Sequence, residues 1–170
     1  RVLMDLYRLT GKAKYEKAVG LLMEQLKEQP RTDSGNFWHK KIYPHQVWLD
    51  GLYMAQPFYM RYGAERGRWD YCRDSLRQFQ NVEQNMNDII TGLYYHGYDE
   101  SKTAFWADKK TGCSRNFWLR SIGWLAMACV DTLEVMPTDL VEEKKKLNLL
   151  FRALMDAVIG FQDRKSGMWY

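Results

Sequence analysis

Apolar residues recur every three or four positions along most of this chain, and this helical spacing limits the fold more than any other feature. No segment alternates apolar and polar residues over the length of a strand, so at most one short strand is expected, near residues 93–96. The sequence therefore predicts an all-α fold with helices over about residues 1–10, 12–28, 44–62, 69–90, 117–136 and 139–161.

Glycine, proline and short polar residues place the ends of these helices. Gly11 ends the first helix, and Pro44 begins the third, because proline lacks an N–H group that would be unpaired in a first turn anyway. Pro57 lies inside the third helix and should kink it. Thr138 or Asp139 is expected to cap the last helix, whose buried stripe comprises Leu147, Leu150, Phe151, Leu154, Val158 and Phe161.

Two segments without periodicity, residues 31–43 and 92–116, are candidate binding loops. The first contains Trp38 and His39 and is expected to be exposed. The second is long for a connection in a compact domain, and such connections are usually functional or disordered. Its aromatic residues argue against disorder. Aromatic residues are 15% of the chain, and two interpretations stay open: the rings contact a ligand, or they fill a helical core.

Composition excludes several classes of protein. With 46% apolar residues the chain is not disordered, and its longest uncharged stretch, around residues 121–130, is far shorter than a membrane span. The net charge of +4 is spread among 21 acidic residues, so no nucleic-acid surface is expected. The three cysteines form no CxxC pair, and Cys72 and Cys129 are expected to be buried thiols. The three histidines lack zinc-ligand spacing, which argues against a metal site.

Asp50 is the first candidate for chemistry. It lies near a helix start, where the helix dipole favours a carboxylate, but Trp48 and its apolar neighbours disfavour a charge. A carboxyl group that keeps its proton near neutral pH is the proton donor that glycosidic chemistry requires. The alternative is an aspartate that only accepts hydrogen bonds from backbone amides at the helix start.

A second candidate group lies at the start of the fifth helix. Arg120 and Trp124 are four residues apart and therefore share a face, with Trp118 close to the same line. A guanidinium flanked by two indoles would bind a carboxylated sugar, since it offers paired hydrogen bonds and flat rings. The alternative is a surface arginine that leans on a tryptophan.

His96 lies in a stretch dense in tyrosine, followed directly by Gly97, which suggests a tight turn that faces a ligand. A histidine there would hydrogen-bond a substrate. Asp99 is expected to cap the next helix.

Three ordered motifs together resemble glycoside hydrolase family 105, the unsaturated rhamnogalacturonyl hydrolases. The resemblance covers nearly the whole chain and rests on YPHQVWLDGLYMA at 43–55, YHGYDE at 95–100 and FWLRSIGW at 117–124.

The resemblance implies part of an (α/α)6 toroid of helical hairpins and an enzyme that removes a 4,5-unsaturated uronic acid from the non-reducing end of lyase-generated oligosaccharides. In this family an aspartic acid protonates the C4=C5 double bond, water adds at C5, and the hemiketal collapses. By position in the motifs, Asp50 would be the acid and Arg120 would bind the uronate carboxylate. The family's binding positions correspond to Trp48, His96, Trp118, Arg120 and Trp124.

The same resemblance sets expectations for the whole chain. Residues 1–170 should be a single, incomplete toroid domain that lacks both ends, and the family's second active-site carboxylate would lie upstream of it. No cofactor, metal, nucleic acid or membrane is implied, and the protein would work in the cytoplasm or periplasm of a polysaccharide-degrading bacterium. Another toroid enzyme, such as a sugar epimerase, and a non-catalytic helical scaffold with Trp48, Trp118 and Trp124 in its core stay open as alternatives.

Overall fold

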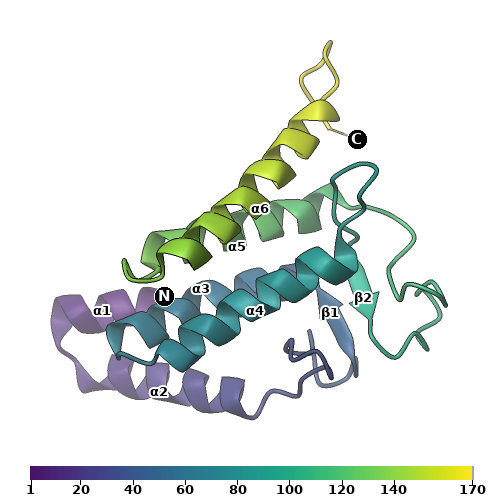
Figure 1. Ribbon diagram of the computed structural model, residues 1–170. Coiled ribbons are helices and arrows are strands. Elements are labelled where there is room, and N and C mark those ends of the chain that lie inside the picture. The colour runs from purple at the N-terminus through teal and green to yellow at the C-terminus, as the bar shows by residue number, and fades with distance from the viewer. Residues whose placement is uncertain (170) are drawn as a thin grey trace.

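The computed structural model describes residues 1–169, which form six helices and one pair of short strands (Figure 1). The helices are α1 (Val2–Thr10), α2 (Ala13–Lys27), α3 (Leu49–Glu65), α4 (Trp69–Met86), α5 (Leu119–Val135) and α6 (Val141–Gly160). The strands are β1 (Gln46–Trp48) and β2 (Gly97–Asp99). The predicted all-α class is confirmed.

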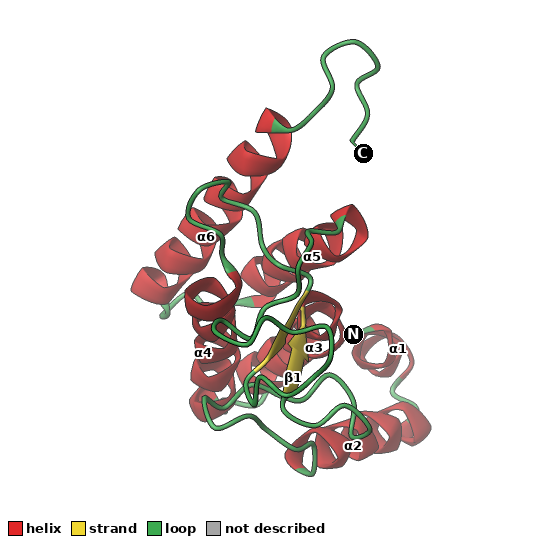
Figure 2. Ribbon diagram, turned by 90° about the vertical axis from the view of Figure 1, so that its right-hand side faces the viewer, coloured by secondary structure: helices red, strands yellow, loops and turns green. Residues whose placement is uncertain are grey.

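Consecutive helices pack as hairpins, α1 against α2, α3 against α4 and α5 against α6. Helix α3 also packs extensively along α5. The long segments that precede α3 and α5 gather with the two strands at one end of the helices, the end that faces the viewer in Figure 2. Each hairpin therefore returns its chain to the same end of the molecule, which places the starts of α3 and α5 together there.

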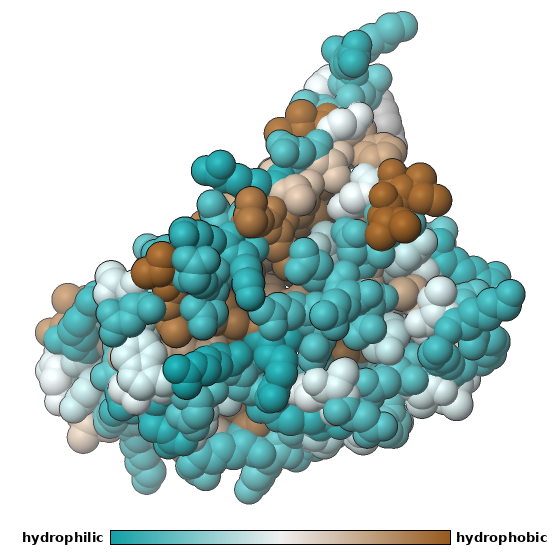
Figure 3. All heavy atoms as spheres, viewed as in Figure 1, coloured by the Kyte–Doolittle hydropathy of each residue, from teal (hydrophilic) through white to brown (hydrophobic). Residues whose placement is uncertain are grey.

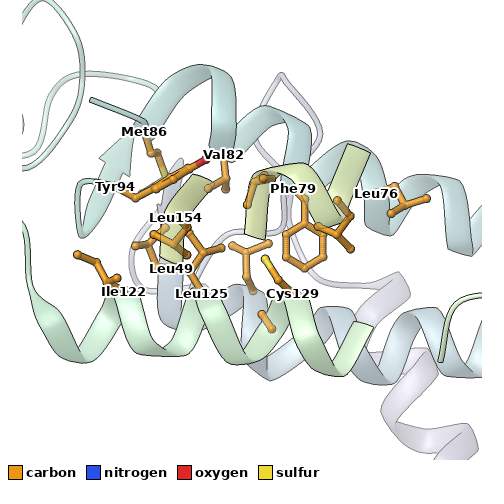
Figure 4. Packing of buried hydrophobic residues seen from close by; sticks show 14 of the residues in the cluster. Leu49, Leu76, Phe79, Val82, Met86, Tyr94, Ile122, Leu125, Cys129 and Leu154 are labelled. Atoms are coloured by element: carbon orange, nitrogen blue, oxygen red, sulfur yellow. The ribbon is translucent and has the colours of Figure 1, made fainter. Parts of the chain in front are cut away.

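Most of the core lies between the last four helices. Side chains from α3, α4, α5 and α6 interdigitate there, and Leu49, Phe79, Leu125, Cys129 and Leu154 are at most 1% exposed (Figure 4). The buried residues of each of these helices recur at helical spacing, so each helix presents an apolar stripe to this core. Cys72 and Cys129 are buried free thiols, as expected.

A second, smaller cluster joins the first hairpin to the opposite side of α3. It contains Met4 of α1, Val19 and Met23 of α2, and Phe58 of α3. Gly11 ends α1 in the left-handed conformation, with φ 64°, and its N–H donates to the carbonyl of Tyr7. This is the turn that a glycine at that position predicts.

The strand pair corrects the predicted start of the third helix. Gln46, Val47 and Trp48 pair antiparallel with Asp99, Tyr98 and Gly97. Pro44 lies in a turn before β1, and α3 begins only at Leu49 and continues through Pro57. The short strand expected at residues 93–96 lies slightly later, at β2. The partner of β1 is about fifty residues away in the sequence, so local spacing could not reveal it.

Three further boundaries differ from the prediction. Helix α4 ends at Met86 rather than near residue 90, and the neighbouring Ile89 and Ile90 are 92% and 90% exposed. Apolar atoms protrude at the loop after α4 in Figure 3. Helix α6 has Leu140 at its N-cap and no capping side chain, and Phe161 is exposed beyond its end. Apolar residues continue at helical spacing past these ends, so periodicity alone misplaces the boundaries by a few residues.

Within the part of the chain that the structure describes, no helix is long and apolar enough to cross a membrane.

Candidate active site

Asp50 and Arg120 meet at the end of the molecule where α3 and α5 begin. Each is the second residue of its helix, and Nη2 of Arg120 lies 3.1 Å from Oδ1 of Asp50. The Asp50 side chain is 15% exposed, whereas Arg120 is half-exposed. Among the described residues, the Asp50 carboxylate accepts a hydrogen bond from Arg120 and none from a backbone N–H group. The interpretation of Asp50 as a simple helix-start acceptor is therefore wrong.

The second oxygen of Asp50 faces His96. Its Oδ2 lies 4.0 Å from Nδ1 of His96, and within residues 1–169 both atoms are buried without a hydrogen-bond partner. A buried polar atom without a hydrogen-bond partner lowers the stability of the fold by about 1–3 kcal/mol. These two atoms therefore mark a place where a further polar group is accommodated. Burial lowers the pKa of His96, with Asp50 opposing the shift and Arg120 adding to it. The imidazole is therefore neutral beside the carboxylate at neutral pH.

Trp118 supports both Arg120 and His96. The guanidinium carbon of Arg120 lies 3.4 Å from the centre of the Trp118 ring, and His96 contacts the same indole edge-on, with 5.0 Å between centroids. Trp118 is 44% exposed, so it is not the core residue that a scaffold interpretation requires. A guanidinium flat on an indole keeps its remaining N–H groups available for a carboxylate.

Trp124 lies apart from this group. It packs on Tyr53 of α3, with 4.6 Å between centroids, one turn further along both helices. No cation–π contact joins Arg120 to Trp124 in the described part of the chain. The prediction that two indoles flank Arg120 is therefore wrong, because only Trp118 does so. Four residues span slightly more than one helical turn, so Trp124 is rotated around the helix relative to Arg120. Its indole packs on the Tyr53 ring instead.

Trp48 is held by rings that sequence reasoning did not assign to the site. His39 and Tyr43 stack on it within 7° of parallel, at 4.4 and 5.4 Å between centroids. Its Nε1 donates to Oε1 of Gln46, and its ring meets His96 at 5.1 Å. The loop that contains His39 was a candidate binding segment, and the structure brings it to Trp48.

The loop of residues 31–43 is anchored more deeply than expected. Asn36 and Phe37 are buried rather than exposed. The Phe37 N–H donates to the side-chain oxygen of Gln78, and the Asn36 amide donates to the Gln78 carbonyl. Buried backbone groups need partners, and a glutamine on α4 supplies them here. The fixed loop in turn fixes His39.

Asp99 organises the second loop instead of capping a helix, which corrects the prediction for this residue. Its carboxylate, 1% exposed, accepts from the N–H groups of Ser101, Thr103 and Ala104 and from the Ser101 hydroxyl. Burial acts to raise the pKa of Asp99, but the hydrogen bonds outweigh it and hold the pKa below its usual range. This fixed turn leads directly into Phe105.

Asp50, His96, Trp118 and Arg120 together form the site cluster. A pocket of about 670 Å³ opens beside this cluster, and its volume is within the range of small-molecule sites. Trp48, His96 and Trp118 form the wall nearest Asp50. The opposite side comes from the long loop and the residue that follows it. Sequence reasoning noted the aromatic residues of this loop but assigned none of its residues after His96 to the site. The residues that line this side of the pocket are Phe105, Trp106, Ser114, Arg115, Asn116 and Phe117.

Comparison with known proteins gives a match over the whole chain. The model of Glycosyl Hydrolase Family 88 matches residues 1–170. The solved structure of a family 105 glycoside hydrolase from C. acetobutylicum superposes with a TM-score of 0.95 at 44% identity, covering 99% of this chain and 47% of that one.

Two curated relatives agree with this match. The chain is 30% identical to unsaturated rhamnogalacturonyl hydrolase YesR of Bacillus subtilis, over 99% of this chain and 48% of the relative. It is 40% identical to protein Atu3128 of Agrobacterium fabrum over 116 residues, which are 68% of this chain and 48% of the relative. The chain thus spans about half the length of the relatives it matches.

Proposed function

Because the chain belongs to the glycosyl hydrolases of families 88 and 105, we propose that its protein removes a 4,5-unsaturated uronic acid from the non-reducing end of oligosaccharides. The proposal extends to oligosaccharides of the rhamnogalacturonan type, which the likeness to YesR supports. The observation that carries it is the Asp50 carboxylate, which bonds Arg120 through one oxygen and faces His96 with the other.

Asp50 is the proton donor in the proposed reaction. Its Oδ2 faces His96 and has no hydrogen-bond partner in the described chain, so Oδ2 is the oxygen that would carry the proton. Transfer of that proton to C4 breaks the C4=C5 double bond and leaves positive charge at C5, shared with the ring oxygen. The carboxylate that forms is stabilised by Arg120.

Water completes the proposed reaction. Its oxygen bonds to C5 while Asp50 takes back a proton, which restores the acid and gives a hemiketal. The hemiketal opens when the bond between C5 and the ring oxygen breaks, which gives a ketone at C5 and a hemiacetal at C1. The hemiacetal then breaks down to an aldehyde and releases the remaining sugar as an alcohol. No step requires a metal or an organic cofactor.

Arg120 binds the uronate carboxylate in this proposal. Its guanidinium is half-exposed and lies flat on Trp118, so N–H groups that do not contact Asp50 remain accessible. A uronate there would sit between the guanidinium and His96, with its ring near Trp48. This arrangement brings the double bond of the sugar toward the buried carboxylate, which is the positioning that general acid catalysis requires.

The test follows the ultraviolet absorbance of the double bond in the full-length gene product with lyase-generated rhamnogalacturonan oligosaccharides. Wild type should remove the absorbance, and Asp50→Asn should slow its loss by about 10²- to 10⁴-fold, the usual contribution of a general acid. Asp139→Asn changes an exposed aspartate outside the cluster and is the matched control, with wild-type rates expected. Persistent absorbance with wild type, or equal rates for both variants, would refute the proposal.

A further inference from the structure

The pocket extends away from Asp50 rather than around it. Asp50 and Arg120 lie outside its lining, whereas His96 and Trp118, which adjoin them, form its near wall. Its far side is made by the loop of residues 105–116. A sugar held at the carboxylate therefore has a second, preformed space next to it, on the side of Trp118.

Phe105 is presented to this space as an exposed ring. The residue is 94% exposed, and the backbone immediately before it is held in place, because the Asp99 carboxylate accepts hydrogen bonds from the N–H groups of Thr103 and Ala104 at 2.8 and 2.7 Å. The neighbouring Trp106 ring packs closely on Gly97 in the same pocket, where a Cβ on residue 97 would lie 3.3 Å from the ring. An aromatic ring that is exposed to solvent at a pocket is suited to stacking on the apolar face of a sugar.

Arg115 brings a positive charge to the same pocket. It is exposed, and within residues 1–169 it has no ion pair and no hydrogen bond from its side chain. Arg120, by contrast, is already bonded to Asp50. An unpaired guanidinium in an aromatic pocket favours a ligand with an anionic group at that point, since charge-assisted hydrogen bonds to a carboxylate are strong.

We infer that this pocket is the subsite for the leaving part of the oligosaccharide, with Phe105 stacking on its first sugar and Arg115 binding a carboxylate carried further along it. The inference rests on the proposed function, because the proposed reaction places the terminal uronate at Asp50. The enzyme would then prefer longer, acidic oligosaccharides over disaccharides. Arg115 is thus a specificity-determining residue outside the reacting cluster.

Two rhamnogalacturonan substrates distinguish a specific role of Arg115 in binding from a general loss of enzyme activity. Both have the terminal unsaturated uronate, but the leaving part of the disaccharide is a neutral deoxysugar, whereas that of the tetrasaccharide contains a uronate. Arg115→Ala should lower kcat/KM for the tetrasaccharide about 10- to 100-fold, mainly by raising KM, and should change kcat/KM for the disaccharide less than about threefold. Phe105→Ala should lower kcat/KM for both substrates about three- to tenfold. Arg152→Ala removes an exposed charge on α6 and should change neither.

A binding measurement keeps the inference testable without turnover. Tryptophan fluorescence of Asp50→Asn, titrated with each saccharide, should show tighter binding of the tetrasaccharide, because Trp106 and Trp118 line the pocket. Adding Arg115→Ala should abolish that preference. Equal effects of Arg115→Ala on both saccharides would overturn the inference while leaving the proposed function intact. Loss of the preference without loss of catalysis on the disaccharide supports both, and a wild-type enzyme that consumes neither saccharide refutes the proposed function.

Discussion

At the scale of single residues, the site depends on two different contacts of one carboxylate. One oxygen of Asp50 lies 3.1 Å from Nη2 of Arg120, and the other lies 4.0 Å from Nδ1 of His96. Arg120 can therefore stabilise the carboxylate that remains after proton transfer while the second oxygen faces the reacting sugar, as the proposed reaction requires.

His96 should titrate below its usual pKa of about 6.5 in the folded protein. Its folded-state pKa is depressed, so its neutral form contributes stability that is fully present above pH 6.5 and is lost as the pH falls through the folded pKa. NMR of the imidazole Cε1–H signals, assigned with His96→Gln, measures the midpoint.

The same signals in urea-unfolded protein give the reference midpoint for that titration. A folded midpoint at or above the unfolded one would show that the carboxylate of Asp50, not burial, dominates the environment of His96.

At the scale of elements, α3 has the most demanding position, since it contacts α4, α5 and the first hairpin at once. Its residues alternate between two clusters, with Leu52 and Met60 in one and Phe58 and Tyr59 in the other. A helix buried on most sides cannot shift without disturbing both clusters. This rigidity fixes Asp50 at its first turn.

Gly63→Ala should destabilise the protein, although alanine is intrinsically the better helix former. A Cβ at this position would lie 2.8 Å from Sγ of Cys72 and 2.9 Å from the carbonyl oxygen of Arg68, where α3 turns into α4. We expect a loss of about 1–3 kcal/mol from the forced displacement, measured by urea unfolding.

Gly20→Ala is the matched control, because a Cβ at Gly20 in α2 meets nothing within 4 Å. It should gain up to about 1 kcal/mol from helix propensity alone. If the two variants changed stability in the same direction, close packing of α3 on α4 would not be the cause.

At the scale of the whole molecule, the larger core draws on all four of the last helices, and Leu125 lies fully buried within it (Figure 4). Leu125→Ala should lower the free energy of unfolding by about 2–5 kcal/mol through lost burial and the cavity left behind. Leu149→Ala changes a side chain that is 66% exposed on α6 and should stay within about 0.5 kcal/mol of wild type. Denaturant midpoints measure both, and equal losses would contradict the assigned core.

The helices themselves could be predicted from the sequence, because their apolar stripes recur within a few residues of one another. Helices α1, α2 and α5 lie close to their predicted bounds. Of the predicted stripe on α6, Leu147, Leu150, Leu154 and Val158 are buried and Phe151 is partly buried. The same local reasoning failed at Pro44 and Ile90, where the chain turns away from the helix for reasons outside the local pattern.

For the site, the sequence by itself determined which residue types were available: Asp50, His96 and Arg120 stand out by their aromatic surroundings and their helical positions. Only the tertiary structure decided which of them meet. The pairing of β1 with β2 and the shared start of α3 and α5 bring together residues 46 to 70 positions apart, and they leave Trp124 with Tyr53. The physical reason is that periodicity records how a helix faces the core, whereas contacts between loops depend on how separate hairpins pack.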